Sequence, residues 1–148
     1  MIGQVTGVIW SQAVIDQMLL ALHTLPTAVI LATPNVGLYT DNHVADPVGD
    51  DPTKFTIPTW AGYAPVVIAS YFGPVNRDLQ DGRNLVCDAD FECTGPGTGY
   101  SVANGIYIWD GASKLYGQAQ FVNPVPVAKP GDSVTLDFLL SLLFRQGT

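Results

Sequence analysis

The chain has 148 residues, of which 47% are hydrophobic and 13% are charged, and its formal net charge is −7 at pH 7. This length fits one domain with a substantial core, and the hydrophobic fraction excludes intrinsic disorder, which needs low hydrophobicity and high charge. Charged residues are scarce beside the roughly 25% usual for globular proteins. We therefore expect a single domain over residues 1–148, some of whose apolar surface faces partner subunits.

The basic residues and the apolar runs argue against two classes of partner. The six Lys and Arg residues are scattered along the chain. Because phosphate binding uses clustered cations, we expect neither nucleic acid nor an anionic membrane as a partner. No apolar run approaches the roughly 20 residues of a membrane-spanning helix. The start of the chain, MIGQVTGVIW, lacks the positively charged region of a secretory signal, so we expect synthesis in a cytoplasm without export by the general route.

Residues 11–23 have the spacing of an amphipathic helix. Its apolar stripe comprises Val14, Ile15, Met18, Leu19 and Leu22. Ser11 suits the N-cap, where its hydroxyl would accept an amide proton of the first turn, and Pro26 prevents the helix from continuing. We expect the stripe to be buried on the domain's own sheet or on a neighbouring chain.

The rest of the chain alternates short apolar segments with turn residues, which is typical of strands. We expect strands within residues 28–32, 36–40 and 64–71. Loops are expected over residues 41–53, and mostly over residues 76–99, where Gly and Asp are frequent.

Three further patterns predict β-structure in the second half of the chain. Gly105–Asp110 and residues 114–121 flank a Gly-Ala-Ser turn, as in a β-hairpin. Lys129–Asp132 fits a type II turn, because Pro presets the second position and Gly accepts a positive φ at the third. From Ser133 onward apolar and polar residues alternate, which favours a strand, although the leucine spacing there also fits a helix.

Together these elements predict a mainly β fold. We expect a β-sandwich or jelly-roll-like domain over residues 27–145, with the N-terminal α-helix of residues 11–23 packed against it. The chain has no internal repeat and no linker that would divide it.

Two groups of acidic residues are candidate cation sites. One is the Asp41–Asp51 loop, and the other comprises Asp88, Asp90 and Glu92, which would share one face of an extended segment. Carboxylate oxygens suit Ca²⁺, but the loop lacks the EF-hand spacing. Surface carboxylates more often keep loops and strand edges hydrated. We therefore favour solvation for both groups and expect no metal and no cofactor.

Cys87 and Cys93 bracket the second acidic group and could close a small loop. The spacing is not a zinc pattern, and the chain has only His23 and His43 to complete one. We predict that the two cysteines lie close enough to form a disulfide, with two free thiols as the alternative, because sequence does not supply the geometry.

No motif in the chain indicates catalysis. Gly95–Gly99 (GPGTG) resembles a phosphate-binding loop, but Tyr-Ser follows it where Lys-Ser/Thr is needed. No Gly-x-Ser-x-Gly elbow is present, and the pairing of His43 with nearby Asp residues would arise in any chain of this size. Tyr107 and Trp109 alternate with Ile, as residues that fill both faces of a sheet do. A sugar-binding platform is the weaker alternative, and we expect no enzymatic activity.

A leucine-rich N-terminal segment is followed by short motifs rich in aromatic residues and glycine. They are, in chain order, Leu38–Asn42 (LYTDN), Trp60–Val66 (WAGYAPV), Gly105–Asp110 (GIYIWD), Leu115–Phe121, Pro124–Val125 and Gly131–Ser133. This order resembles a broad family of small virion-associated structural proteins of tailed bacteriophages and prophages. The resemblance covers most of the chain from Ser11 onward and is interrupted over residues 76–99.

The resemblance implies a non-enzymatic structural protein of a tailed-phage virion, made in the cytoplasm of the bacterial host. A capsid decoration (cement) protein or a head–tail assembly component is the function we favour, and a tail-associated binding module for a host-surface glycan or receptor is the alternative. Expected partners are copies of the chain itself, the major capsid protein or tail components. The residues expected at the assembly interface are Tyr107, Trp109, Leu139 and Leu143.

Overall fold

The computed structural model describes Gly3, residues 9–12, Val14 and residues 34–42, 51–68, 82–96 and 99–143. Within two strands, the side chains of residues 82–88 and 137–143 lie outside this description. The described elements are β1 (Ile9–Trp10), β2 (Asn35–Tyr39), the 3-10 helix η1 (Pro52–Lys54), β3 (Val66–Val67), β4 (Gly82–Glu92), β5 (Ser101–Trp109), β6 (Leu115–Val127) and β7 (Ser133–Leu143). The described chain is therefore mainly β, as the sequence predicts.

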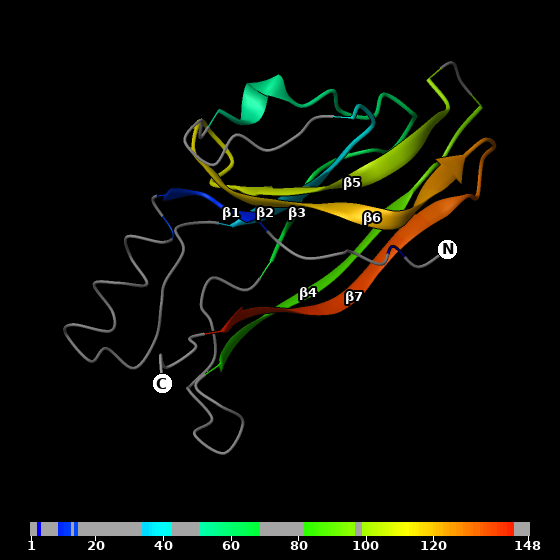
Figure 1. The fold of residues 1–148 in the computed structure, drawn as a ribbon. Coiled ribbons are helices and arrows are strands. Elements are labelled where there is room, and N and C mark those ends of the chain that lie inside the picture. The colour runs from blue at the N-terminus through cyan, green and yellow to red at the C-terminus, as the bar shows by residue number, and fades with distance from the viewer. Residues whose placement is uncertain are drawn as a thin grey trace.

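A five-stranded antiparallel sheet forms one layer, in the order β1-β6-β5-β2-β3 (Figure 1). β5 and β6 form the hairpin predicted around residues 111–113. Asp110 closes its turn, because its Oδ1 accepts the N–H groups of Ala112, Ser113 and Lys114 at 2.8, 2.9 and 3.0 Å. These bonds hold the pKa of Asp110 below its usual value, and the bond from the Lys114 N–H has the largest effect.

β4 and β7 form a second, two-stranded sheet and pair along their whole length, from Gly82 opposite Leu143 to Glu92 opposite Ser133. β4 corrects the prediction of a loop over most of residues 76–99. Its acidic residues alternate with apolar ones, so that Phe91 is buried while Glu92 is exposed. Because this alternation lets β4 bury its apolar face while it pairs with the apolar strand β7, β4 forms a strand despite the low strand propensity of Asp and Gly.

The connection from β6 to β7 confirms two predictions. Lys129–Asp132 is a type II turn, since Gly131 has a φ of 90° and the Asp132 N–H donates to the Lys129 carbonyl at 3.2 Å. From Ser133 the chain continues as a strand, with Val134 and Leu136 buried on one face. The helical alternative for this segment is therefore wrong.

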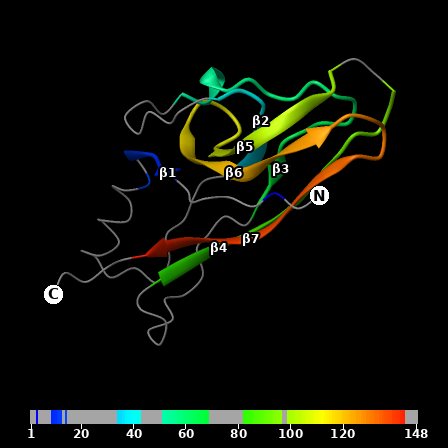
Figure 2. The ribbon, with the colours of Figure 1, turned by 45° about the vertical axis from the view of Figure 1, so that its right-hand side comes forward.

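The main core lies between the two sheets. Figures 1 and 2 show the β4–β7 ribbon beneath the five-stranded sheet and crossing its strands obliquely. Buried side chains of both layers form one apolar cluster, which includes Phe91 of β4, Leu136 of β7, Leu38 of β2 and Ile106 of β5. Each fully buried side chain of this size stabilises the fold by about 1.5–3 kcal/mol, so this cluster is the main attraction between the layers.

The N-terminal segment bridges the two sheets. The Gly3 N–H donates to the Thr135 carbonyl of β7 at 2.9 Å, whereas β1 pairs with β6. A Cβ on Gly3 would lie 2.6 Å from the Phe121 ring and 3.2 Å from Leu136. A side chain at this position would therefore push the two layers apart.

Most of the helix predicted over residues 11–23 lies outside the described residues, which include only Ser11, Gln12 and Val14 of it. Val14 is buried in the main core, as the predicted stripe requires. Among the described residues the Ser11 hydroxyl has no hydrogen-bond partner, whereas the Ser11 carbonyl accepts the Val14 N–H at 3.1 Å. Ser11 also continues the pairing of β1 with β6, since its N–H donates to the Tyr116 carbonyl at 2.6 Å. The predicted side-chain cap is not seen in the described residues.

The predicted strands of the first half are shown in part. Residues 28–32 lie outside the described residues, and residues 36–40 correspond to β2. The strand predicted over residues 64–71 is shorter in its described part, where β3 spans Val66–Val67. None of the helical segments in the described ranges is long and apolar enough to cross a membrane.

Candidate functional site

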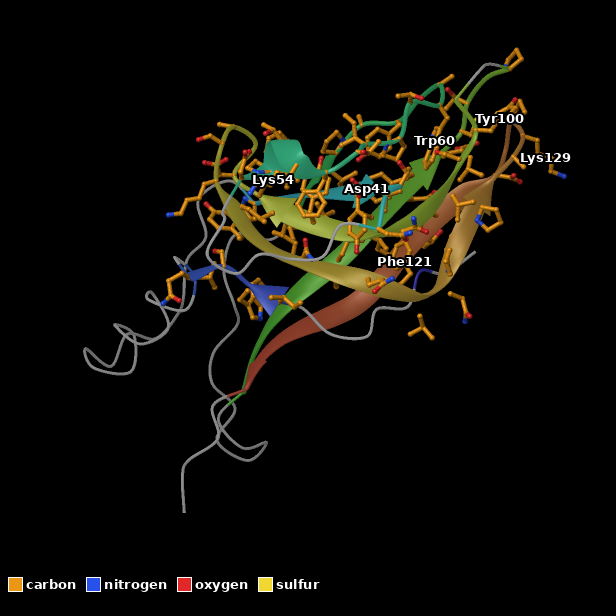
Figure 3. All side chains as sticks on the ribbon, turned by 45° about the horizontal axis from the view of Figure 1, so that its top comes forward. Asp41, Lys54, Trp60, Tyr100, Phe121 and Lys129 are labelled. Carbon is orange, nitrogen blue, oxygen red and sulfur yellow. The ribbon has the colours of Figure 1, made fainter. Side chains whose placement is uncertain are left out.

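Exposed apolar side chains gather where β5 begins and β6 ends. We call this surface the distal patch; it comprises Tyr100, Val102, Val122, Pro124 and Pro126. The exposed fractions of Tyr100, Val102 and Val122 are 40%, 42% and 53%. Figure 3 shows Tyr100 at the end of the molecule that also carries Lys129, far from Lys54.

Strand pairing brings the members of the distal patch together. Val102 and Pro126 are direct partners in the β5–β6 ladder. Val122, Pro124 and Pro126 alternate along β6 and are all exposed, while Val125 and Val127 are buried in the main core. Alternate residues of a strand share a face. Val102 and Pro126 therefore lie on the outer face of the hairpin, and Val122, Asn123 and Pro124 are exposed in the irregular stretch of β6 that precedes Val125.

A wide irregularity in the hairpin shapes the patch. Ala103 pairs with Val125 but Gly105 pairs with Gln120, so residues 121–124 of β6 stand opposite Asn104 alone. Asn104 is anchored because its Nδ2 donates to the Thr40 carbonyl at 2.7 Å and to the Asp41 carbonyl at 3.2 Å. Bulges of this kind change the direction of the side chains within them. Val122 and Pro124 lie within this bulge, and both are exposed.

Sequence reasoning missed the distal patch. Its signal is the repeated proline of Val122–Val127 (VNPVPV). Proline lacks an N–H to donate and is confined within sheets to edges, strand starts and bulges. Two prolines at alternate positions therefore indicate a strand with an edge that no further strand pairs with.

The four residues predicted at the assembly interface fall in two places. Tyr107 is buried within its own chain, its ring stacked on Phe55 with centroids 4.9 Å apart and planes at 8°. Trp109 is half-buried and packs on the same aromatic cluster. The side chains of Leu139 and Leu143 lie outside the described residues, and their backbones pair with Val86 and Gly82. Tyr107 and Trp109 therefore pack together inside their own chain, with ring centroids 5.9 Å apart.

The acidic loop near Asp41 is a structural cap in its described part. Asp51 caps η1, with Oδ1 accepting from the Thr53 N–H at 2.9 Å and the Thr53 hydroxyl at 2.6 Å. Both bonds lower the pKa of Asp51, and the bond from the Thr53 hydroxyl has the larger effect. Asp41 Oδ2 accepts the Thr56 N–H at 3.0 Å. These carboxylates thereby position Phe55, which covers Tyr107.

The described residues hold no group of three or more His, Cys, Asp or Glu side chains arranged to bind a metal. His43, Asp46 and Asp50 lie outside the described residues. On β4, Asp90 and Glu92 are exposed on one face, as predicted, and Asp90 Oδ1 accepts the Thr135 hydroxyl at 2.9 Å. The side chain of Asp88 is not described.

The predicted disulfide between Cys87 and Cys93 is wrong. Cys93 is a free, buried thiol, and its Sγ contacts the Gly95 carbonyl oxygen at 3.6 Å. Cys87 lies within β4, and Cys93 follows directly after this strand. An extended strand rises about 3.3 Å per residue, which places the two Cα atoms roughly 20 Å apart, far beyond the roughly 7 Å limit for a disulfide.

Tyr63 closes the edge of the five-stranded sheet beside β2. Its hydroxyl accepts the Leu38 N–H at 2.8 Å and donates to the Leu38 carbonyl at 3.2 Å, so one side chain takes the place of a neighbouring strand. The Thr40 N–H next along donates to the Thr56 carbonyl at 2.8 Å. This edge is consequently not available for pairing with another chain at these positions.

We expect Tyr63→Phe to lower the free energy of unfolding by about 1–3 kcal/mol, because it leaves the Leu38 N–H and carbonyl without their partner. Urea denaturation measures the change. Tyr100→Phe is the matched control, since Tyr100 is exposed, and it should leave stability unchanged. Equal stabilities of the two variants would contradict the role given to the Tyr63 hydroxyl.

Burial, and after it the nearby Asp41 carboxylate, raise the pKa of Tyr39 to about 12. An unfolded tyrosine ionises near pH 10, so the folded state holds this proton more tightly. The stabilising contribution is complete below pH 10 and is lost as the pH rises towards 12. We expect the free energy of unfolding to fall across this range and to fall less in Tyr39→Phe. Identical pH profiles for the two proteins would refute this assignment.

The described residues thus form a two-layer β fold with exposed apolar side chains at the end where β5 begins and β6 ends. Comparisons of the chain with protein-family models, with curated proteins and with solved structures found no match.

Proposed function

We propose that this chain is a non-enzymatic structural protein of a tailed-phage virion, acting as a capsid decoration (cement) protein or as a head–tail assembly component. The observation that carries the proposal is the distal patch, because exposed apolar surface rimmed by polar residues is typical of protein–protein contacts. The phage setting rests on the order of sequence motifs from Leu38–Asn42 to Gly131–Ser133. In this setting the protein is made in the host cytoplasm and resides in the virion.

Several described carboxylates support a structural role because each is bonded within a turn or cap. Asp51 caps η1, Asp110 closes the β5–β6 turn, and Asp132 Oδ2 accepts the N–H groups of Ala128 and Lys129 at 2.9 and 3.2 Å. These groups fix backbone geometry near the ends of strands. They serve a rigid scaffold well, since a docking surface gains affinity when it is held in place before contact.

We also propose that the two sheets form a β-sandwich, on which a helix over residues 11–23 packs. The shared core between the layers supports the sandwich, and the burial of Val14 in that core supports the helix. A solution or crystal structure tests this assignment. Residues 15–23 in an extended conformation would contradict the helical part.

Mass spectrometry of purified phage particles from cells that encode this chain tests the proposed function. We expect the intact chain to remain with the particles after gradient purification, at a copy number in the hundreds for a capsid decoration and much lower for a joint or a tail part. Particles of full infectivity and stability that lack the chain would overturn the proposal.

The alternative function, a tail-associated module that binds a host-surface glycan or receptor, is favoured by the exposure of Tyr100 at the end of the molecule. Aromatic side chains at such positions suit contacts with sugars and proteins. Direct binding of the purified chain to host cells, lost in Tyr100→Ala and accompanied by a low copy number per particle, would favour this alternative.

A further inference from the structure

We propose that Asn104 is a modification site, at which deamidation takes place once β5 separates from β2 and then prevents the chain from refolding. Asn104–Gly105 is the one Asn-Gly pair in the sequence. Glycine has no Cβ to shield its backbone nitrogen, so this nitrogen readily attacks the side-chain carbonyl carbon of a preceding asparagine. The inference goes beyond the proposed virion role and does not depend on it.

The reaction replaces the side-chain amide of Asn104. The Gly105 backbone nitrogen bonds to Cγ of Asn104 and loses its proton, while the Asn104 Nδ2 leaves as ammonia, so that a cyclic imide forms. Water then adds to either carbonyl carbon of the ring and opens it. One product is aspartate, and the other is isoaspartate, in which the backbone runs through the side chain and gains one atom. The net change is one water consumed and one ammonia released, without oxidation or reduction.

The fold holds the reacting groups away from the geometry of ring closure. An Asn-Gly pair is typical of a two-residue hairpin turn, yet this pair lies inside β5, which β2 and β6 flank in the five-stranded sheet. The Asn104 Nδ2 donates to the Thr40 carbonyl at 2.7 Å and to the Asp41 carbonyl at 3.2 Å. Both the backbone and the leaving amide are therefore fixed, and ring closure requires that β5 separate from β2.

Both products are incompatible with the paired sheet. Aspartate has no N–H to donate in place of Nδ2, so the carbonyls of Thr40 and Asp41 would lose their donor and face a carboxylate oxygen. Isoaspartate would lengthen β5 directly before Gly105, where even a Cβ would overlap the Ala119 carbonyl oxygen and the Tyr39 ring. Modified chains therefore do not restore the register of β5, and their unfolding becomes irreversible.

Mass spectrometry of peptides from the full chain, incubated at mildly alkaline pH in buffer or in guanidinium chloride, tests the inference. In denaturant we expect Asn104 to deamidate before the other asparagines. In buffer its reaction should be at least about a hundredfold slower, because interior strands open in only a small fraction of molecules. After the denaturant is removed, unmodified chains should refold and chains modified at Asn104 should not. Equal rates in the two solutions, or modified chains that regain the native melting temperature, would overturn the inference.

Asn104→Asp reproduces one product without the reaction. We expect this variant to stay unfolded or to melt at least about 5 °C below the unmodified chain. Asn123→Asp is the matched control, because it adds the same charge at an exposed position of β6 in the bulge opposite Asn104, and it should melt with the unmodified chain. The Pro124 nitrogen that follows Asn123 carries no proton, so this position does not form the cyclic imide. Equal melting temperatures of the two variants would show that an aspartate at position 104 does not prevent folding.

Discussion

Gly105→Ala should destabilise the protein by about 3 kcal/mol or prevent it from folding. A Cβ on Gly105 would overlap the Ala119 carbonyl oxygen of β6 and the hydroxyl end of the Tyr39 ring. The first of these is backbone in the middle of the five-stranded sheet, which cannot move without breaking its own pairing. Overpacking of this kind typically costs about 1–3 kcal/mol and occasionally more.

Gly95→Ala is the control for this effect, because a Cβ there would lie 3.4 Å from the Ala61 side chain, at ordinary contact distance. We expect Gly95→Ala to change the free energy of unfolding by less than about 1 kcal/mol. Urea denaturation of the two variants decides the matter. A Gly105→Ala protein as stable as Gly95→Ala would show that β5 and β6 are not packed as described.

Phe91→Ala should lower the free energy of unfolding by about 3–5 kcal/mol, the usual cost of removing a buried aromatic side chain. Phe91 projects from β4 into the main core and stacks on Tyr63, with ring centroids 5.8 Å apart and planes at 25°. Tyr63 in turn holds the edge of β2 through Leu38. The substitution thus removes a contact that joins the two sheets.

Hydrogen exchange distinguishes this joining role from a local defect. If the layers form one cooperative unit, the amides of β4–β7 and of the five-stranded sheet should lose protection together in Phe91→Ala. Ile57→Ala serves as the control, since Ile57 is 46% exposed and its truncation should cost less than about 0.5 kcal/mol. Loss of protection confined to β4 would contradict the shared core.

The turns of this fold could be predicted from sequence because their chemistry is local. Gly111 follows Asp110 in the β5–β6 turn and has a φ of 83°. Glycine adopts this left-handed conformation without strain, so the residue type alone predicts the turn. The same holds for Gly131 in the turn before β7. In both places two to five adjacent residues determine the backbone, so a pattern of Pro, Gly and Asp is sufficient.

β4 and the distal patch could not be predicted in the same way, because distant segments determine them. Ala89 and Phe91 are strand residues because Leu136 and Val134 pair with them. The sequence of residues 82–92 does not by itself indicate that β7 is the partner strand. Tyr107 was expected at an interface, yet Phe55 from the segment after η1 covers it. Which face of a strand is covered depends on tertiary packing, and strand propensity follows that packing.

A cryo-electron microscopy map of the phage particle from cells that encode this chain tests the central claim most directly. The claim is that the protein works by packing against other protein chains through an apolar face. The account predicts density for the two-layer fold in the shell or at the head–tail joint, with Val102, Val122 and Pro126 buried against a neighbouring chain. A map in which the chain is present with these three side chains facing solvent, or in which the chain is absent from the particle, would contradict it.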